Sequence, residues 1–356
     1  MHVSSQDEFA LIARLTRSLA SHSDVLLGVG DDCAVLDLNA DTLLLATCDS
    51  QVEGVHFTLQ TASPEEIGRK ALAVNLSDIA AMGGTPRFAL VSLILPSHFS
   101  LPTLDGIYAG LQREAELFST LIVGGNVSGA GKSAQLAIDI TLLGTADRGH
   151  VLTRSGAHIG DVLCVTGHPG DSAAGLHTLL HPLASSEPAL DAAGETKPPL
   201  AYSEPALSTV RTAHRTPHPR VREGQLLAQL GPEIVTSLLD ISDGLSGDLV
   251  HICERSHVGA RVEVAALPFS PSILTIAVEA QYDPLLWTLH GGEDYELLFT
   301  VSPAHLQHVR DLIQNTTGTP VTPIGTILPA SDGLQLLFPD NHIEPMPVKS
   351  WNHLAQ

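Results

Sequence analysis

The segment LLDISDGLSGDLVHI, residues 238–252, places Asp240, Asp243 and Asp248 among leucine, isoleucine and valine residues. An ionised carboxylate buried among apolar side chains is destabilising unless a cation or hydrogen-bond donors meet it. The segment itself contains no Lys or Arg. We therefore expect these carboxylates at the ends of apolar elements, where they either organise the backbone or hold a metal ion.

Length and charge limit the partners that this chain can have. It has 356 residues, 44% of them hydrophobic, which predicts two domains, placed here at residues 1–150 and 151–356. Lys and Arg number 18 against 39 Asp and Glu, so the formal net charge is -21. The negative electrostatic field of such a protein repels phosphate backbones and anionic membranes, and we expect neither nucleic acid nor membrane as a partner. A small anionic substrate remains compatible with this charge if metal ions mediate.

The cysteines and the N-terminus indicate a cytoplasmic protein. The four cysteines are far apart and form no CxxC pair, so their spacing favours neither a zinc site nor a disulfide framework. Residues 1–20 are typical of an amphipathic helix and lack an apolar signal core. The longest apolar stretch, near residues 88–96, is too short to span a bilayer.

Helical and strand-like periodicity alternate along the chain, which predicts an α/β fold with mixed sheets in both halves. In the first half a strand begins at Leu43, and the pattern predicts helices at 7–21, 64–84 and 103–119. It also predicts a buried strand at 88–96 and further strands at 120–125 and 134–146. The second half is predicted to contain strands at 161–167, 260–268, 291–301, 321–327 and 333–338 and helices at 171–180, 222–231 and 304–318. Residues 182–206 hold five prolines and many small residues, and are predicted to form a mobile surface loop.

Residues 124–133, GGNVSGAGKS, partly match a phosphate-binding loop. Gly131, Lys132 and Ser133 fit its end, but Asn126 stands where the pattern needs its first glycine. A helix should also follow the lysine, whereas residues 134–146 favour a strand. We therefore reject this interpretation.

Five segments place Asp or Glu beside Gly or Ser at the edge of an apolar element: 28–36, 46–57, 75–84, 239–249 and 290–299. Mg²⁺ prefers oxygen ligands, usually one or two carboxylates for each ion together with substrate phosphates and water. Considered singly, each carboxylate favours a structural role: a turn at Asp31 and Asp32, a helix cap at Asp243, a surface charge at Asp78. Together, the five segments favour a metal-assisted phosphotransferase.

The same motifs closely resemble those of the thiamine-monophosphate kinase family. They run in the family's order from residue 28 to the C-terminus: GVGDDCAVL, GVHF, KALAVNLSDIAAMGG, VLTRSGAHIGD, VTGHPGDSAAGL, ISDGLSGDL, HGGEDYELLF and SWNHL. The resemblance implies a two-domain aminoimidazole ribonucleotide synthetase-like fold whose N-terminal domain pairs across a homodimer. It also implies that the γ-phosphoryl group of ATP is transferred, with Mg²⁺, to thiamine monophosphate.

The resemblance also implies roles for individual residues. The implied Mg²⁺ ligands are Asp32, Thr47, Asp49, Asp78, Asn126, Asp240 and Asp243. The implied nucleotide contacts are Thr47, Tyr108, Gly125, Asn126, Arg154 and Ser242. The implied substrate contacts are His56, Glu293 and Trp351, and Asp243 and Arg154 are the implied catalytic residues. Two positions depart from the family, since Cys48 stands where a hydroxyl is usual and Asn126 where many members carry Asp.

An ionised phosphate acceptor needs no strong general base, so catalysis is expected to come from in-line positioning and charge neutralisation. Asp240 and Asp243 would then meet Mg²⁺, whereas Asp248, further along the predicted helix, is expected at the surface. Two alternatives remain: another ATP-using enzyme of the superfamily, and a nucleotide-binding homologue without activity. Trp351 could also anchor the terminus rather than stack on thiamine.

Overall fold

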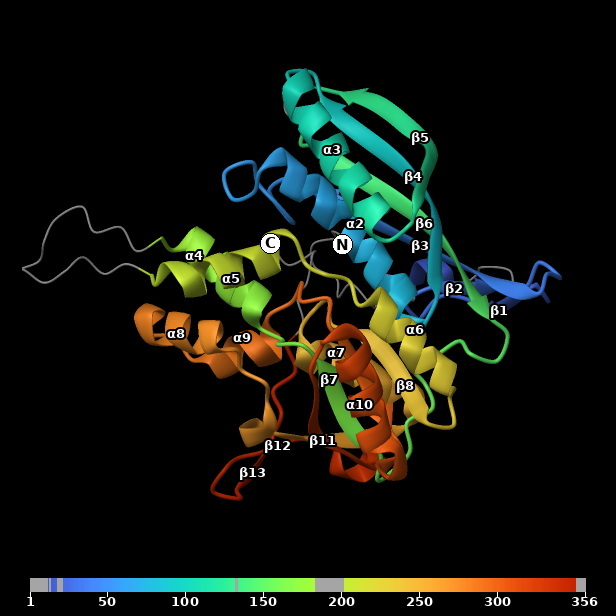
Figure 1. Cartoon of the computed structure of the whole chain (residues 1–356), viewed down its shortest axis with the longest axis vertical. Coiled ribbons are helices and arrows are strands. Elements are labelled where there is room, and N and C mark those ends of the chain that lie inside the picture. The colour runs from blue at the N-terminus through green and yellow to red at the C-terminus, as the bar shows by residue number, and fades with distance from the viewer. Residues whose placement is uncertain (1–11, 13, 18–21, 132–133, 183–201, 350–356) are drawn as a thin grey trace, which may run out of the picture.

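A computed structural model describes residues 12, 14–17, 22–131, 134–182 and 202–349. Within these residues the chain forms two mixed sheets, one from each half of the sequence (Figure 1). The α/β fold with mixed sheets that was predicted is confirmed. Most of the predicted helix at 7–21 and the residues around Trp351 lie outside the described residues.

The first sheet has six strands in the order β1-β2-β3-β6-β4-β5. Their bounds are β1 Val25–Leu27, β2 Ala34–Leu36, β3 Thr42–Val52, β4 Thr85–Pro96, β5 Leu121–Ala130 and β6 Ala137–Asp147. Only the pair β4 and β5 is parallel. Two helices pack against each other on one side of this sheet, α2 (Pro64–Ala81) and α3 (Leu101–Leu117). The strand β6 follows residues 124–133, so the chain lacks the helix that a phosphate-binding loop requires there.

Local signals set the ends of α2. The Ser63 hydroxyl accepts from the Glu66 amide, the Glu66 carboxylate accepts from the Ser63 amide, and Pro64 occupies the first turn. This capping box pairs donors that a helix start leaves unpaired. At the other end Gly83 has a φ of 68°, which favours glycine and stops the helix.

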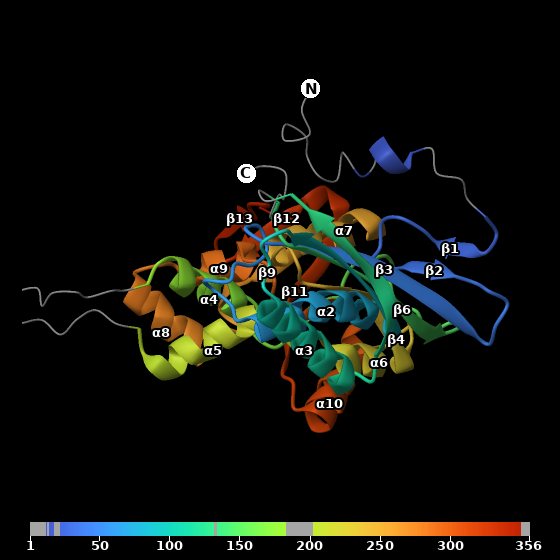
Figure 2. The ribbon, with the colours of Figure 1, turned by 90° about the horizontal axis from the view of Figure 1, so that it is seen from above.

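The helix α2 lies between the two sheets. Thirteen of its eighteen residues are buried, and its apolar side chains share one core with residues of both halves. Figures 1 and 2 show α2 enclosed by β3, β6 and α3 on one side and by α6 and β8 on the other. Polar side chains of α2 therefore face the boundary between the two halves.

The second sheet has seven strands in the order β13-β12-β9-β11-β7-β10-β8, with only β12 and β9 parallel. Their bounds are β7 Val162–Thr166, β8 Val235–Asp240, β9 Val258–Glu263, β10 Leu297–Val301, β11 Val321–Pro329, β12 Leu334–Leu337 and β13 Ile343–Pro345. The helices around it are α4 Asp171–Leu180, α5 Glu204–Arg215, α6 Val221–Leu230, α7 Leu245–Ser256, α8 Pro271–Ala280, α9 Pro284–His290 and α10 Leu306–Thr317. Three of these helices, α5, α8 and α9, were not predicted.

Two predicted elements need correction. The strand at 88–96 was expected to be buried, but β4 alternates: Ala89, Val91 and Leu93 are buried, while Leu90 and Ile94 are exposed. One face of the first sheet is therefore open. In addition, residues 204–206 of the predicted loop begin α5.

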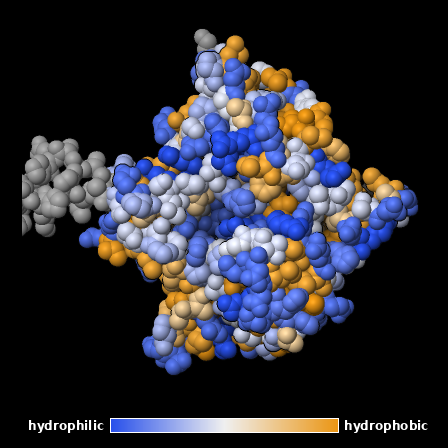
Figure 3. Space-filling view, in the orientation of Figure 1, coloured by the Kyte–Doolittle hydropathy of each residue, from blue (hydrophilic) through white to orange (hydrophobic). Residues whose placement is uncertain are grey.

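Apolar side chains collect on this open part of the molecule. Figure 3 shows an orange patch over β4 and β5, and its exposed residues include Leu90, Ile94, Leu121, Val123 and Val127. The strand β5 ends the sheet. Elsewhere, none of the helices in the described ranges combines the length and the hydropathy needed to cross a bilayer.

Candidate active site

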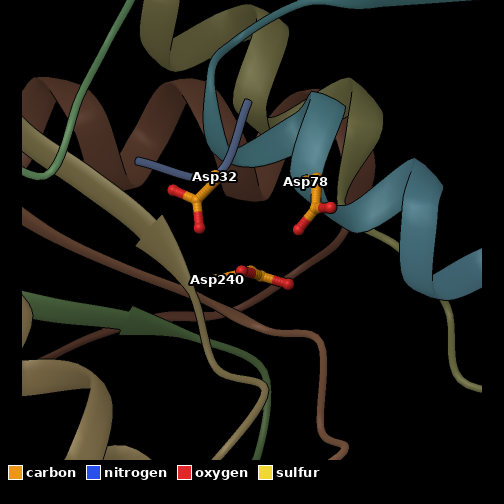
Figure 4. A group of neighbouring side chains, drawn as sticks. All are labelled: Asp32, Asp78 and Asp240. Carbon is orange, nitrogen blue, oxygen red and sulfur yellow. The ribbon is translucent and has the colours of Figure 1, made fainter. Parts of the chain in front are cut away.

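Three carboxylates from separate parts of the chain meet between the two halves. Asp32 follows the short strand β1, Asp78 projects from α2, and Asp240 ends β8. One oxygen atom from each lies within 4.8 Å of the others, and Figure 4 shows all three groups facing a common space. We refer to Asp32, Asp78 and Asp240 as the carboxylate trio.

Arg154 is the cation that approaches the trio. Its guanidinium donates to Asp32 Oδ1 at 2.5 Å, and its backbone amide lies 3.3 Å from Asp31 Oδ2. The site also raises the pKa of Asp31 to about 7, first through burial and then through the charge of Asp32, against the opposing effect of Arg154. One arginine thus faces several buried carboxylates.

Hydroxyl groups orient the other two members of the trio. Thr47, on β3, donates to Asp78 Oδ2, and Ser77 donates to Asp240 Oδ2 at 2.5 Å. Burial, followed by the charge of Asp32, raises the pKa of Asp240 to about 8. The trio is held together by neighbouring groups although its members repel one another.

The chemistry of the trio fits a divalent metal ion. Asp32 Oδ2 is buried and has no hydrogen-bond partner among the described residues. Such an orphaned acceptor is destabilising unless a cation meets it. Three carboxylates and the nearby Thr47 hydroxyl are hard oxygen donors of the kind that Mg²⁺ prefers.

The turn after β8 shows that one expectation was wrong. Asp248 was expected at the helix surface, but it is buried, and its Oδ2 accepts the backbone N–H groups of Ser242, Asp243 and Gly244 at 3.1 Å each. Gly244 is the N-cap residue of α7, so Asp243 is not the cap. The side chain that organises the turn is Asp248, which accepts the backbone amides of Ser242 and Asp243.

Two neighbouring residues of β3 point to opposite faces of the first sheet. Thr47 contacts Asp78 on the side of α2, and on the same side the Asp49 backbone amide donates to Asn75 Oδ1 at 3.2 Å. Cys48 is exposed on the other face, where the Thr141 hydroxyl lies 3.5 Å from its sulfur. The departure from a hydroxyl residue at position 48 therefore lies away from the trio.

The structure does not bring Asn126 to the trio within one chain. Asn126 pairs with Ser92 of β4, on the open face of the sheet, and its side chain donates to Ser128 at 3.0 Å. Gly125 precedes it on the same edge strand, and Tyr108 lies on α3. Their predicted roles in binding nucleotide stay predictions.

His56 and Glu293 are brought to one place, beside a pocket between α2 and α5. His56 lines this pocket together with Lys70, His214 and other residues. Glu293 forms an ion pair with Lys70, with 2.7 Å between Nζ and Oε1, and its Oε2 lies 3.4 Å from His214 Nδ1. Sequence reasoning missed Lys70 and His214; the signal for Lys70 was a second cation, next to Arg69, directly before the apolar run 71–74 of the predicted helix 64–84. Trp351 lies outside the described residues.

Comparisons with known proteins show the family of this chain. Residues 30–146 match the N-terminal domain of the AIR synthase related protein family, and residues 158–335 match its C-terminal domain. The chain is 38% identical to thiamine-monophosphate kinase of Escherichia coli strain K12 over 98% of each sequence. It is 35% identical to the Bacillus subtilis strain 168 enzyme of the same name, over 98% of this chain and 99% of the relative. A solved structure of AaThiL complexed with AMPPCP and TMP aligns over 99% of both chains, with a TM-score of 0.81 and 30% identity.

Proposed function

Because this chain belongs to the thiamine-monophosphate kinase family, we propose that it transfers the γ-phosphoryl group of ATP to the phosphate of thiamine monophosphate. The product is thiamine diphosphate. The observation that carries the proposal is the carboxylate trio with its buried, unpartnered Asp32 oxygen, next to one arginine and beside a separate pocket. ATP as co-substrate also implies a cytoplasmic location, where ATP is made available to enzymes.

In this proposal Asp32, Asp78 and Asp240 hold Mg²⁺, with Thr47, Asp49 and Asp243 as further ligands. Bound Mg²⁺ would neutralise phosphate charge and orient the transferred group. The trio would otherwise repel an anionic nucleotide, so binding of ATP is expected to depend on the metal.

The chain's own residues supply the remaining functions. Arg154, fixed by Asp32, presents a guanidinium to the phosphate region and would stabilise charge that develops during transfer. Ser242 stands in the turn that Asp248 organises, and in this proposal it would contact a nucleotide phosphate. His56 and Glu293 would bind the part of the substrate that does not react, and so set the distance of its phosphate from ATP.

We further propose that the enzyme is a homodimer formed through the open face of the first sheet. The edge strand β5 and the exposed apolar side chains on β4 and β5 support this interface. A second copy would place Gly125 and Asn126 near a nucleotide site that one chain leaves without them. Sedimentation analysis tests the dimer, and a monomer at assay concentration would contradict it.

One assay tests the activity. The protein is incubated with Mg-ATP and thiamine monophosphate, and thiamine diphosphate and ADP are measured. Equal amounts of both products are expected. ATP consumption without thiamine diphosphate would favour another ATP-using enzyme of the superfamily, and no ATP consumption would favour an inactive nucleotide-binding homologue.

The substitution Asp243→Asn tests the proposed metal ligand in the turn. We expect turnover to fall roughly 10- to 100-fold, because an amide is a weaker ligand for Mg²⁺ than a carboxylate. The melting temperature should change little, because the bond from the Asp243 backbone to Asp248 is kept. Kinetics that stay at the wild-type level across a Mg²⁺ titration would remove Asp243 from the metal site.

The substitution Asn126→Asp tests the position where many family members carry Asp. The unaltered protein is expected to be active but to need more Mg²⁺ for half-maximal rate than Asn126→Asp, because a carboxylate binds a hard cation better. Ser128→Asp adds the same charge two residues away and is the control. An equal Mg²⁺ requirement in Asn126→Asp and the unaltered protein would show that residue 126 is not a ligand.

A further inference from the structure

Lys70 is a buried cation in the middle of α2. Only 5% of its side chain is exposed, and its neighbours on the helix, Ile67 and Ala71, belong to the core. A buried ammonium is destabilising even when it is paired, and an apolar residue of similar volume would often serve stability as well or better. Stability alone therefore does not explain a lysine at position 70, and we look for a functional role.

Its partner Glu293 has an unusual backbone. The φ of Glu293 is 64°, a conformation that is uncommon for a residue with a side chain, and its amide donates to Ser242 O at 2.7 Å. The carboxylate of the next residue, Asp294, accepts hydrogen bonds from the backbone amides of Gly170 and Ser172. The two neighbouring carboxylates therefore contact different parts of the structure. This loop directs Glu293 to Lys70 while 24% of the Glu293 side chain stays exposed.

His214, on α5, approaches the other oxygen of Glu293. Its Nδ1 is 3.4 Å from Glu293 Oε2 and 3.2 Å from the Ser172 hydroxyl. Burial, followed by the charge of Lys70, lowers the pKa of His214 to about 3, so the ring is neutral at physiological pH. Burial alone would raise the pKa of Glu293, but the positive charge and hydrogen bond of Lys70 oppose it, and that pKa is lowered. Glu293 is thus an ionised carboxylate that is fixed in position, and its oxygen atoms can accept further hydrogen bonds.

The pocket beside these residues offers complementary polar groups. His56 Nδ1 accepts the Val52 amide at 3.0 Å, so the proton of a neutral His56 ring is on Nε2. Glu293 can only accept. An aminopyrimidine has both a donating amino group and accepting ring nitrogens, and so matches this pair. Lys70 and Asp78 are eight residues apart on α2, or about 12 Å, so the pocket and the carboxylate trio can hold opposite ends of one extended substrate.

We propose that Lys70 and His214 are positioning residues that hold Glu293 as the acceptor for the amino group of the substrate's pyrimidine. This inference rests on the proposed function, because it takes thiamine monophosphate as the substrate. Lys70 acts through Glu293 and not on the reacting phosphate. It should therefore govern KM for the acceptor and selectivity for the amino group, and leave the KM for ATP unchanged.

The test compares thiamine monophosphate with oxythiamine monophosphate, in which an oxygen replaces the pyrimidine amino group. The wild type should prefer the amino form, measured as a ratio of kcat/KM values. A hydrogen bond to a charged group is worth roughly a 10- to 100-fold change in binding. We expect Lys70→Met and Glu293→Gln each to raise KM for thiamine monophosphate by that factor and to lower the preference similarly. Arg113→Met, which removes an exposed ion pair with Glu65, is the matched control.

The double variant Lys70→Met/Glu293→Gln keeps the inference testable if the single variant Lys70→Met fails to fold. It leaves no unpaired charge, so it should fold even if Lys70→Met does not. We expect its KM and its lost preference to equal those of Glu293→Gln, because the two residues act as a unit. Wild-type preference in Lys70→Met or in the double variant would overturn the inference, as would strictly additive effects. If the wild type does not phosphorylate thiamine monophosphate at all, it is the proposed function that fails.

Discussion

Asp240→Asn is expected to reduce kcat by roughly 10²–10³-fold while leaving the melting temperature of the ligand-free protein unchanged or higher. Asp240 is buried, and one of its oxygens lies within 4.8 Å of oxygens of Asp32 and Asp78. Three carboxylates this close together repel one another and are poorly solvated, so removing one charge reduces the electrostatic repulsion. The Asn side chain keeps the shape, and its carbonyl can still accept from Ser77. Loss of activity together with no loss of stability marks a residue kept for function.

A second readout separates metal binding from general damage. A ligand that binds only the folded protein stabilises it, by about 2.7 kcal/mol when its concentration is 100 times its Kd. Mg-ATP should therefore raise the melting temperature of the wild type but hardly that of Asp240→Asn. Asp311→Asn changes an exposed aspartate on α10 and should behave as the wild type does. Normal turnover by Asp240→Asn, or an undiminished response to Mg-ATP, would remove Asp240 from the metal site.

The elements that could be predicted from the sequence were those with local signals. The helix α2 begins where Ser63, Pro64 and Glu66 indicate, and it ends before Gly83. The trio was also within reach of sequence reasoning, because its three segments share one pattern of an acidic residue at the edge of an apolar run. The fold then brings these edges together between the two sheets.

Contacts between distant residues could not be predicted in this way. Lys70 and Glu293 are far apart in the sequence, and nothing local in residues 64–84 identifies the partner of the lysine. The helix α5 was missed because its first residues, from Glu204, follow a stretch rich in proline and small residues. Asn126 could be placed on a strand, but which face of the sheet it occupies depends on the register with Ser92.

Asp248 illustrates a different reason for error. A helix with Asp248 in its first turn is typical of a favourable charge near the positive end of the helix dipole, which requires no burial. The preceding turn, however, curls over the helix start and directs three amides to one carboxylate oxygen. A carboxylate in the first turn of a helix can be exposed to solvent, or it can accept backbone amides of the preceding turn. Which of the two occurs here depends on the path of residues 241–244, and the pattern of apolar residues does not predict that path.

The last prediction follows from this geometry. Asp248→Ala leaves the amides of Ser242, Asp243 and Gly244 without their acceptor, in a turn where Gly244 is buried and the other two residues are half-buried. Unsatisfied buried donors are destabilising by about 1–3 kcal/mol each, and relief of the buried charge offsets part of this. We expect a net loss of about 3 kcal/mol in the free energy of unfolding, which for domains of this size lowers the melting temperature by roughly 6–12 °C. Activity should fall as well, because the same turn positions Asp243.

Thermal unfolding of two variants checks the explanation. Asp283→Ala removes another aspartate that accepts a backbone amide, that of Leu285 at 2.9 Å, but at the exposed start of α9. An exposed helix cap is worth about 1 kcal/mol, so Asp283→Ala should melt well above Asp248→Ala and retain full activity. Asp248→Asn should fall between them, because its carbonyl oxygen can still accept some of the three amides. If Asp248→Ala were as stable as Asp283→Ala, the amides would have found other partners, and the turn that carries Asp243 would owe its shape to the chain around Gly244 rather than to one buried carboxylate.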